Sequence, residues 1–297
     1  MHDSYLTGFP WRHFRGFISP RAERFSILKE LLDEASLDYT VLTISGNRHF
    51  FITPLMPSAG LAESRPSSIL VAHYDRARDS PGANDNSAGV FLLLETAIKL
   101  KTDNEKNWAV IFTDKEELEP GESIVDQGSY TLAAALKKLK MEHARIFSFD
   151  ACGAGDTLII STTIECLLKK EGSGENLREP VFELRQFALN TARDLGMAKV
   201  LLAPTPFSDD AGFFRAGLAA QTITMLPSNE CIKLVSDLRK NPGLANALIS
   251  AELPGVRHSQ SIPETWRSLN TPSDSYLRLT PKNFRGVVKF AEALCKG

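Results

Sequence analysis

The feature of this sequence that most restricts its fold is a series of short apolar runs separated by amphipathic stretches. The clearest runs span residues 68–73, 108–113 and 144–149, and each has the composition of a buried strand. Helices are predicted between them, at 87–101 and 130–140. Strands that alternate with helices indicate an α/β fold, in which a mainly parallel sheet is covered by helices on both faces.

The remaining elements follow from the same patterns. Before the first apolar run we expect a helix at 19–37 and two strands, at 39–45 and 49–53, separated by the hairpin signal Gly46-Asn47. This hairpin indicates an antiparallel edge, which makes the central sheet mixed but mostly parallel. After the third run the expected elements are strands at 158–161 and 219–225, helices at 181–195, 210–215, 232–250 (broken at Pro242) and 281–294, and loops at 169–178 and 253–280.

Composition excludes several classes of protein. Of the 297 residues, 43% are hydrophobic and 24% are charged, as in soluble globular proteins. The balance of 34 basic against 36 acidic residues argues against a nucleic-acid partner. Four cysteines without a C-x-x-C pair indicate free thiols in a reducing compartment. No linker divides the chain, so we expect a single domain over 1–297, with 1–18 as an N-terminal extension.

The same sequence gives no sign of a membrane or a secretory route. No apolar stretch approaches the ~18 residues that span a bilayer. The first 17 residues also lack the apolar core of a signal peptide. We therefore expect a cytoplasmic protein with no membrane partner, while its oligomeric state stays open.

Polar side chains gather where the apolar runs end. A histidine closes the first run, and acidic residues follow each of the three runs within a few positions. Because ligands of open α/β sheets bind outside the carboxyl ends of the strands, these side chains are expected to meet in one crevice. The set comprises His73, Asp75, Asp85, Glu116, Glu117 and Asp150.

This set carries a chemical requirement. Several carboxylates at one site cannot all remain ionised without a counter-charge. A divalent cation is the usual solution, and a mixture of His, Asp and Glu ligands suits zinc, while carboxylate-rich ligation also suits manganese. The sequence therefore predicts a site for one or two divalent metal ions.

In order and placement these residues resemble the co-catalytic di-zinc aminopeptidase family of the bacterial leucyl aminopeptidase type. The resemblance extends from about residue 20 to the end of the chain. It implies the zinc-dependent exopeptidase fold and the hydrolysis of peptide or aminoacyl substrates. The matching pieces are His73-x-Asp75, Gly82-x-x-Asp85-Asn86-x-x-Gly89, Glu116-Glu117 and Asp150, with two weaker ones at Ser208-Asp209 and Asn270-Thr271-Pro272-Ser273-Asp274.

The resemblance also implies which residues hold the metal ions. His73 and Asp150 would bind the first zinc ion, Glu117 would bind the second, and Asp85 would bridge the two. A cis peptide bond between Asp85 and Asn86 belongs to the same implied arrangement.

Two further residues receive catalytic roles from the resemblance. Glu116 would be the general base that takes a proton from the attacking water. Asp75 would orient the ring of His73.

One position departs from the family pattern. The family has a histidine where this chain has Asn270, and that histidine would complete the second metal's ligands beside Asp85 and Glu117. A carboxamide oxygen is a poor substitute for imidazole on zinc, so the second site becomes all-oxygen. It would then be weaker, empty, or filled by manganese or magnesium. His258, on a nearby predicted loop, is an alternative ligand.

Other residues have plainer interpretations. Asp209 is expected to cap the helix at 210–215. His49 and His143 are expected at the surface, and Cys152 is expected to be buried and inert. The aromatic residues Phe207, Phe213 and Trp266 fit the core better than a specificity pocket.

Three functions remain open. The first is a zinc-dependent exopeptidase, most simply an aminopeptidase, with Glu116 as its general base. The second is an inactive binding or scaffold homologue, suggested by Asn270 but opposed by the intact Glu116. The third is a glutaminyl cyclase on the same fold, which the resemblance disfavours because the cyclases use the missing histidine with the equivalents of Asp85 and Glu117.

Overall fold

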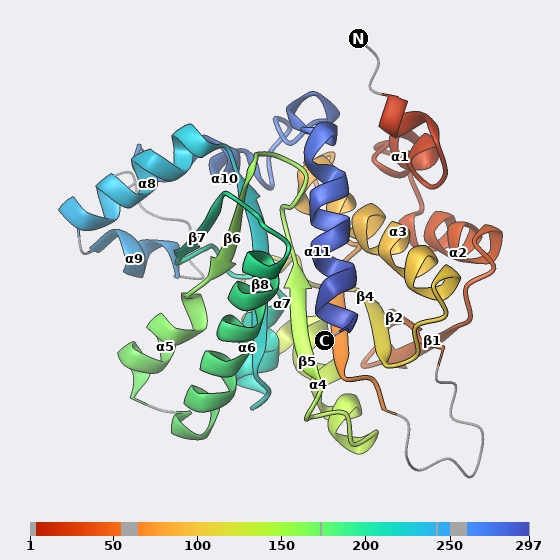
Figure 1. The fold of residues 1–297 in the computed structure, drawn as a ribbon, viewed down its shortest axis with the longest axis horizontal. Helices are drawn as coiled ribbons and strands as arrows, with labels where there is room; N and C mark the ends of the chain where they lie inside the picture. The colour runs from red at the N-terminus through yellow and green to blue at the C-terminus, as the bar shows by residue number, and fades with distance from the viewer. Residues whose placement is uncertain (1–3, 55–64, 173, 242, 250–259, 297) are drawn as a thin grey trace.

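Eight strands form one mixed sheet in the order β1-β2-β4-β3-β5-β8-β6-β7 (Figure 1). The computed structural model describes residues 4–54, 65–172, 174–241, 243–249 and 260–296. The central strands β4, β3, β5 and β8 run parallel, while β2 and β6 lie antiparallel to their inner neighbours. The strands are β1 (Tyr39–Ile44), β2 (Asn47–Ile52), β3 (Ser68–His73), β4 (Trp108–Thr113), β5 (Arg145–Phe149), β6 (Thr157–Ser161), β7 (Val200–Ala203) and β8 (Ala220–Leu226).

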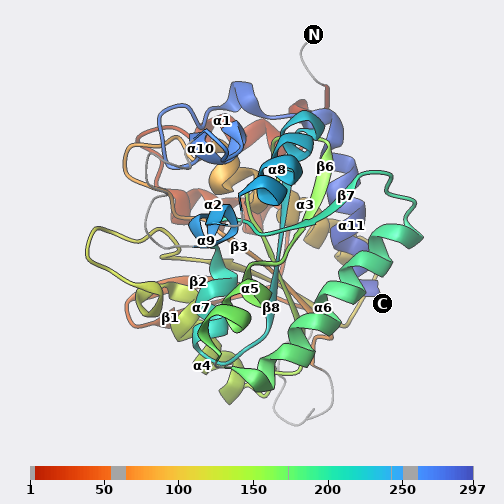
Figure 2. The same cartoon turned by 90° about the vertical axis from the view of Figure 1, so that its left-hand side faces the viewer.

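Helices cover both faces of this sheet. Figure 2 shows α6 and α11 on the opposite side of the sheet from α4 and α7. No helix of the described residues has both the length and the apolar character that crossing a membrane requires. The helices are α1 (Phe14–Phe17), α2 (Arg24–Glu34), α3 (Gly89–Thr102), α4 (Gly128–Lys138), α5 (Thr163–Glu171), α6 (Glu175–Asp194), α7 (Asp209–Arg215), α8 (Ser228–Lys240), α9 (Gly243–Leu248), α10 (Glu264–Ser268) and α11 (Phe284–Lys296).

The apolar composition of the central strands follows from this double cover. Side chains of a strand point alternately to opposite faces. In β3, Leu70 and Ala72 pack into the core beneath α3 and α11, whereas Ile69 and Val71 pack into the core beneath α4. All six residues of β3 are therefore buried, as expected for a parallel strand covered twice. The predicted α/β fold with a mixed, mostly parallel sheet is confirmed.

The N-terminal segment packs onto the first of these cores. Trp11, Phe14 and Phe17 are all buried, and the ring of Trp11 stacks on Phe284 of α11 with 4.5 Å between centroids. Residues 1–18, predicted as an extension, thus contribute from residue 4 onward to the packing around α11.

Several predicted elements differ from the structure. The prediction of a loop over 169–178 is wrong, because α5 extends to Glu171 and α6 already begins at Glu175. This stretch is polar because α6 buries only a narrow stripe that includes Leu177 and Val181. Strand β7 was not predicted, since it has only four residues and just one of them, Ala203, is buried. The short helix α10 interrupts the loop predicted at 253–280, whereas Pro242 lies outside the described residues.

The contact between α4 and α7 generates a prediction about stability. A Cβ atom on Gly212 of α7 would lie 2.2 Å from Ser129 Oγ and 2.9 Å from the backbone nitrogen of Tyr130. Gly212→Ala should therefore destabilise the fold by about 1–3 kcal/mol in urea unfolding. Gly286→Ala in α11, where the added carbon meets nothing within 4 Å, is the matched control. It should stabilise the fold by about 0.5–1 kcal/mol. Equal effects of the two changes would contradict this account of the helix contact.

Candidate metal centre

Three neighbouring parallel strands end at the same level and deliver the polar residues. His73 is the last residue of β3 and lies in register with Thr113, the last residue of β4. Glu116 and Glu117 follow β4 by a short loop, and Asp150 directly follows β5. The carboxyl ends of these strands therefore form one site, as predicted for an open α/β sheet.

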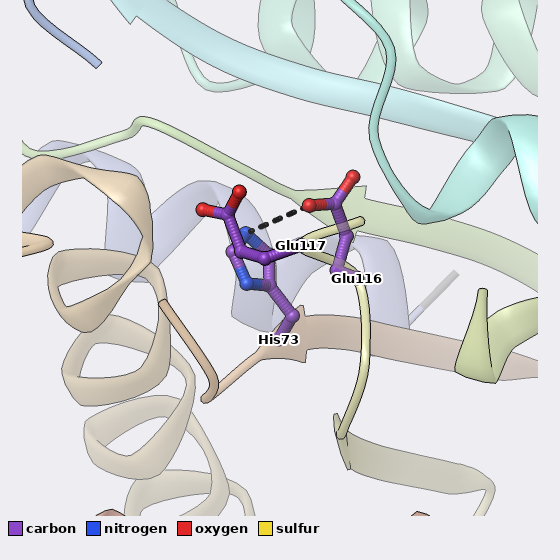
Figure 3. Close-up of side chains that lie close together, drawn as sticks. All are labelled: His73, Glu116 and Glu117. Atoms are coloured by element: carbon purple, nitrogen blue, oxygen red, sulfur yellow. Dashed lines mark ion pairs between the residues drawn. The ribbon is translucent and has the colours of Figure 1, made fainter. Parts of the chain in front are cut away.

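The side chains converge on the imidazole of His73, which is fully buried. Its Nε2 atom lies 3.1 Å from Asp85 Oδ1, 3.8 Å from Asp150 Oδ1 and 3.9 Å from Glu116 Oε2. Figure 3 shows the carboxylates of Glu116 and Glu117 beside this ring. Two sets have ligand atoms within 4.8 Å of one another: His73 with Asp85 and Asp150, and His73 with Glu116 and Glu117.

Asp75 ties the ends of two strands together. Its Oδ1 atom lies 3.3 Å from Nδ1 of His73. The two carboxylate oxygens also accept hydrogen bonds from the backbone N–H groups of Glu116, at 3.2 Å, and Glu117, at 3.0 Å. Burial opposes ionisation of Asp75, but His73 and these two donors outweigh it and lower its pKa. Asp75 thus fixes the ring of His73 and the loop after β4 at once.

The loop that carries Asp85 is fixed by buried hydrogen bonds. The carboxylate of Asp274 accepts the backbone N–H groups of Asn84, at 2.8 Å, and Asp85, at 3.0 Å. The side chain of Asn86 donates to the carbonyl oxygen of Phe149 at 2.8 Å, which joins the loop to β5. The peptide bond between Asp85 and Asn86 is cis, as the family resemblance implied.

Burial of so many carboxylates raises their pKa values. Burial, with the neighbouring charge of Asp85, raises the pKa of Glu117 to about 9. Burial also raises the pKa of Glu116 well above its ordinary value, and Glu117 and Asp150 add to the rise. The pKa of Asp85 is raised by burial and by Asp150. In the absence of a cation, protons must therefore compensate the crowded negative charge.

The donor atoms fit a divalent cation. Both ring nitrogens of His73, Oε1 of Glu117 and Oδ1 of Asp150 are buried and form no well-aligned hydrogen bond within the described part of the chain. Buried polar atoms normally have partners. One imidazole and several carboxylates are a suitable donor set for zinc and an acceptable one for manganese.

A cavity of about 830 Å³ opens beside this cluster. Its lining combines the carboxylates of the cluster with apolar residues that include Phe207 and Trp266, and it also contains Arg267. Those two aromatic residues therefore line the cavity rather than only the core, whereas Phe213 is fully buried in the core, as expected. Asn270 also lies on the cavity wall, exposed and with a left-handed backbone φ of 59°.

Two expectations about individual residues are wrong. His49 is not at the surface but fully buried, because β2 is paired on both edges beneath the loop after β4. Its Nδ1 accepts the backbone N–H of Asp114, and burial lowers its pKa to about 4. Asp209 does not cap α7 but accepts a hydrogen bond of 2.7 Å from the hydroxyl of Thr113.

Other expectations agree with the structure. His143 is exposed, and Cys152 is buried. All four cysteines are free. His258, the alternative ligand, lies outside the described residues.

Sequence reasoning missed Gln127, at the start of α4. Its side-chain amide donates to Oε1 of Glu116 at 3.0 Å and to the backbone carbonyl oxygen of Glu116 at 3.3 Å. Gln127 is almost fully buried, so this contact is protected from water. No local pattern marks it, since it acts across the loop between β4 and α4.

Asp210, in the first turn of α7, generates a prediction about pH. It is fully buried, and burial raises its pKa from 3.8 to about 7. Between these two values the folded state retains a proton that the unfolded chain has released, so stability falls as pH rises through this window. Asp210→Asn removes this titration. In urea unfolding of metal-free protein, the variant should lose less stability than wild type between pH 4 and pH 8. An identical pH dependence would exclude Asp210 as the titrating group.

Comparisons with known proteins agree with the metal-ligand character of this cluster. The sequence model of peptidase family M28 matches residues 59–276. Among solved structures, a leucine aminopeptidase precursor from Bacteroides thetaiotaomicron is 14% identical, with a TM-score of 0.62 and coverage of 96% of this chain and 94% of that one. A glutaminyl cyclase from Porphyromonas gingivalis is 15% identical, with a TM-score of 0.59 and coverage of 96% and 95%.

A zinc aminopeptidase from Bacillus subtilis is 19% identical, with a TM-score of 0.52, and the match covers 84% of this chain and 48% of that one. This chain therefore spans about half the length of that enzyme. No curated protein sequence matches the chain. At these identities the solved structures show a shared fold.

Proposed function

Because this chain belongs to peptidase family M28, we propose that it is a metal-dependent exopeptidase, and specifically an aminopeptidase. One observation carries the proposal: Glu116 lies beside a buried cluster of metal-ligand type, at the side of a cavity large enough for a substrate. The Glu116 carboxylate is not what holds this loop to the strand beside it, since Asp75 binds the backbone N–H groups of Glu116 and Glu117.

The cluster would hold one or two divalent cations, with zinc as the preferred ion. His73, Asp85 and Asp150 would hold the first, while Asp85, Glu117 and the oxygen of Asn270 would hold a second. Such an ion supplies a Lewis acid that polarises the scissile carbonyl and makes water more acidic.

The chain's own residues then supply orientation and proton transfer. With its carboxylate 3.3 Å from Nδ1, Asp75 would keep the ring proton of His73 on that nitrogen once Nε2 binds an ion, so that the lone pair of Nε2 faces the other ligands. Glu116 takes the proton of the attacking water and passes it to the leaving amine. Gln127 binds Oε1 of Glu116 and so leaves Oε2 for that transfer.

The cavity supports attack at the end of a chain. The carboxylates in its lining attract a positively charged α-amino group, and its apolar residues offer room for one large side chain. An aminoacyl or short peptide substrate combines these two features.

A glutaminyl cyclase is the second candidate, because the cyclase from Porphyromonas gingivalis shares the fold over nearly its whole length. The presence of Asn270 at the position of the family's histidine argues against it. Incubation with a peptide that begins with glutamine distinguishes the two functions. A peptidase releases free glutamine, whereas a cyclase product is lighter by one ammonia.

Glu116→Gln tests the proposed general base. The carboxamide cannot accept a proton, so kcat on an aminoacyl reporter should fall by about 10²–10⁴-fold while metal content is unchanged. Glu119→Gln, an exposed change in the same loop, is the control and should keep full activity. Full activity of the Glu116 variant would reject this residue as the base.

Asn270→His tests the second metal position. Wild-type protein should carry nearer one metal ion than two by elemental analysis, and added manganese or zinc should raise its activity. The new imidazole should tighten the second ion and increase the rate on aminoacyl substrates. Two zinc ions at full occupancy in wild type would mean that either this oxygen ligand suffices or His258 takes the place of the missing histidine, and the argument from ligand type would be wrong. If neither added metal nor Asn270→His produces hydrolysis, the scaffold interpretation replaces the enzyme.

A further inference from the structure

Arg24, the first residue of α2, is an arginine with only 6% of its surface exposed. Arginine is rarely buried unless its charge is compensated, because that charge is costly to remove from water. Both terminal nitrogens of Arg24 donate hydrogen bonds, while Nε has no partner within the described residues. The site of burial is therefore informative. Arg24 lies beneath the loops that carry the metal-ligand residues.

One guanidinium nitrogen binds the chain just after β3. Nη1 donates to the carbonyl oxygens of Tyr74, at 3.0 Å, and Asp75, at 2.9 Å. These are the two residues that follow His73. The position of this backbone sets both the ring of His73 and the carboxylate of Asp75 that orients it.

The other terminal nitrogen binds the loop that leads to Asp85. Nη2 donates to the carbonyl oxygen of Pro81 at 2.8 Å and to the hydroxyl of Ser87 at 2.8 Å. That hydroxyl in turn donates to the carbonyl oxygen of Gly82 at 2.5 Å. Gly82 itself has no room for a side chain, since a Cβ atom would lie 2.6 Å from the carbonyl oxygen of Asp85.

The chemistry of this contact is specific to arginine. The guanidinium is planar, and its donors point in fixed directions, so one group can bridge two separate loops. A lysine ammonium has the same charge but a single nitrogen. The ring of Phe17 lies under the guanidinium, with 4.9 Å from Cζ to the centroid, and closes it off from water.

We propose that Arg24 is a positioning residue of the metal centre, which clamps the His73 loop to the Asp85 loop and thereby sets the affinity for the metal ion. The inference rests on the proposed function only in that it takes this cluster as a metal site. Arg24 lies outside residues 59–276, so this role falls to a helix beyond the segment that the family model matches.

The test compares zinc affinity in two conservative variants. Arg24→Lys keeps the positive charge but removes the planar guanidinium with its two terminal nitrogens. It should weaken zinc binding by about 10–100-fold in competition with a chromogenic chelator. Arg185→Lys is the matched control, because Arg185 is a largely buried arginine of α6 paired with Glu165 at 2.7 Å. Its zinc affinity should equal that of wild type. Melting of the metal-free proteins shows whether each variant is folded.

The measured zinc affinities separate this proposal from the proposed function. Wild-type zinc affinity in folded Arg24→Lys overturns the positioning role, even if the protein is an active peptidase. If zinc binding is weakened in Arg24→Lys while zinc-loaded wild type hydrolyses no substrate, the positioning role is supported and the peptidase is refuted. At saturating zinc, Arg24→Lys should regain most of its kcat, which a direct catalytic role of Arg24 would not allow.

Ser87→Ala provides a second route if Arg24→Lys fails to fold. It removes one of the three loop contacts of Nη2, which also donates to the carbonyl oxygens of Pro81 and Gly82, and it leaves the guanidinium in place. The change also removes the hydrogen bond from this hydroxyl to Gly82, so zinc affinity should fall by at least about threefold. Unchanged affinity in folded Ser87→Ala would overturn the proposal.

Discussion

Negative charge confined at the carboxyl ends of parallel strands is the constraint on which the rest of this structure depends. Five carboxylates lie around the imidazole of His73, and burial raises the pKa values of Asp85, Glu116 and Glu117. Besides the ring of His73, neutral and backbone donors bind two of these carboxylates. Asp75 uses two backbone N–H groups, and Gln127 uses an amide. The arrangement therefore stays rigid while its negative charge remains available for a cation.

The sequence was sufficient for those parts of the molecule that local patterns determine. Strand β3 was predicted at its observed bounds because a strand buried on both faces must be apolar throughout. The ligand cluster was predicted because the ends of such strands share one edge. Arg24, Gln127 and His49 escaped prediction because their importance comes from contacts across the fold. The helix at α6 was cut short in the prediction because a solvent-facing helix needs few apolar residues.

The cavity beside the cluster is lined by chemically unlike side chains, and Asn270 is one of them. Carboxylates of the cluster and aromatic and aliphatic side chains both contribute to the lining. An amide in this lining is neutral at every pH and can both donate and accept hydrogen bonds. A histidine there would change its charge near neutrality. The departure from the family pattern therefore affects the polarity of the substrate's surroundings as well as the number of metal ligands.

The packing of Phe17 over Arg24 links the very start of the fold to its centre. Residues just beyond it are held too, since the guanidinium of Arg76 donates to the carbonyl oxygens of Ile18 and Pro20. Removal of residues 1–18, which the sequence alone identifies as an extension, would uncover a buried cation and admit water beneath two ligand loops. Any shortened version of this protein must therefore keep its aromatic N-terminal segment.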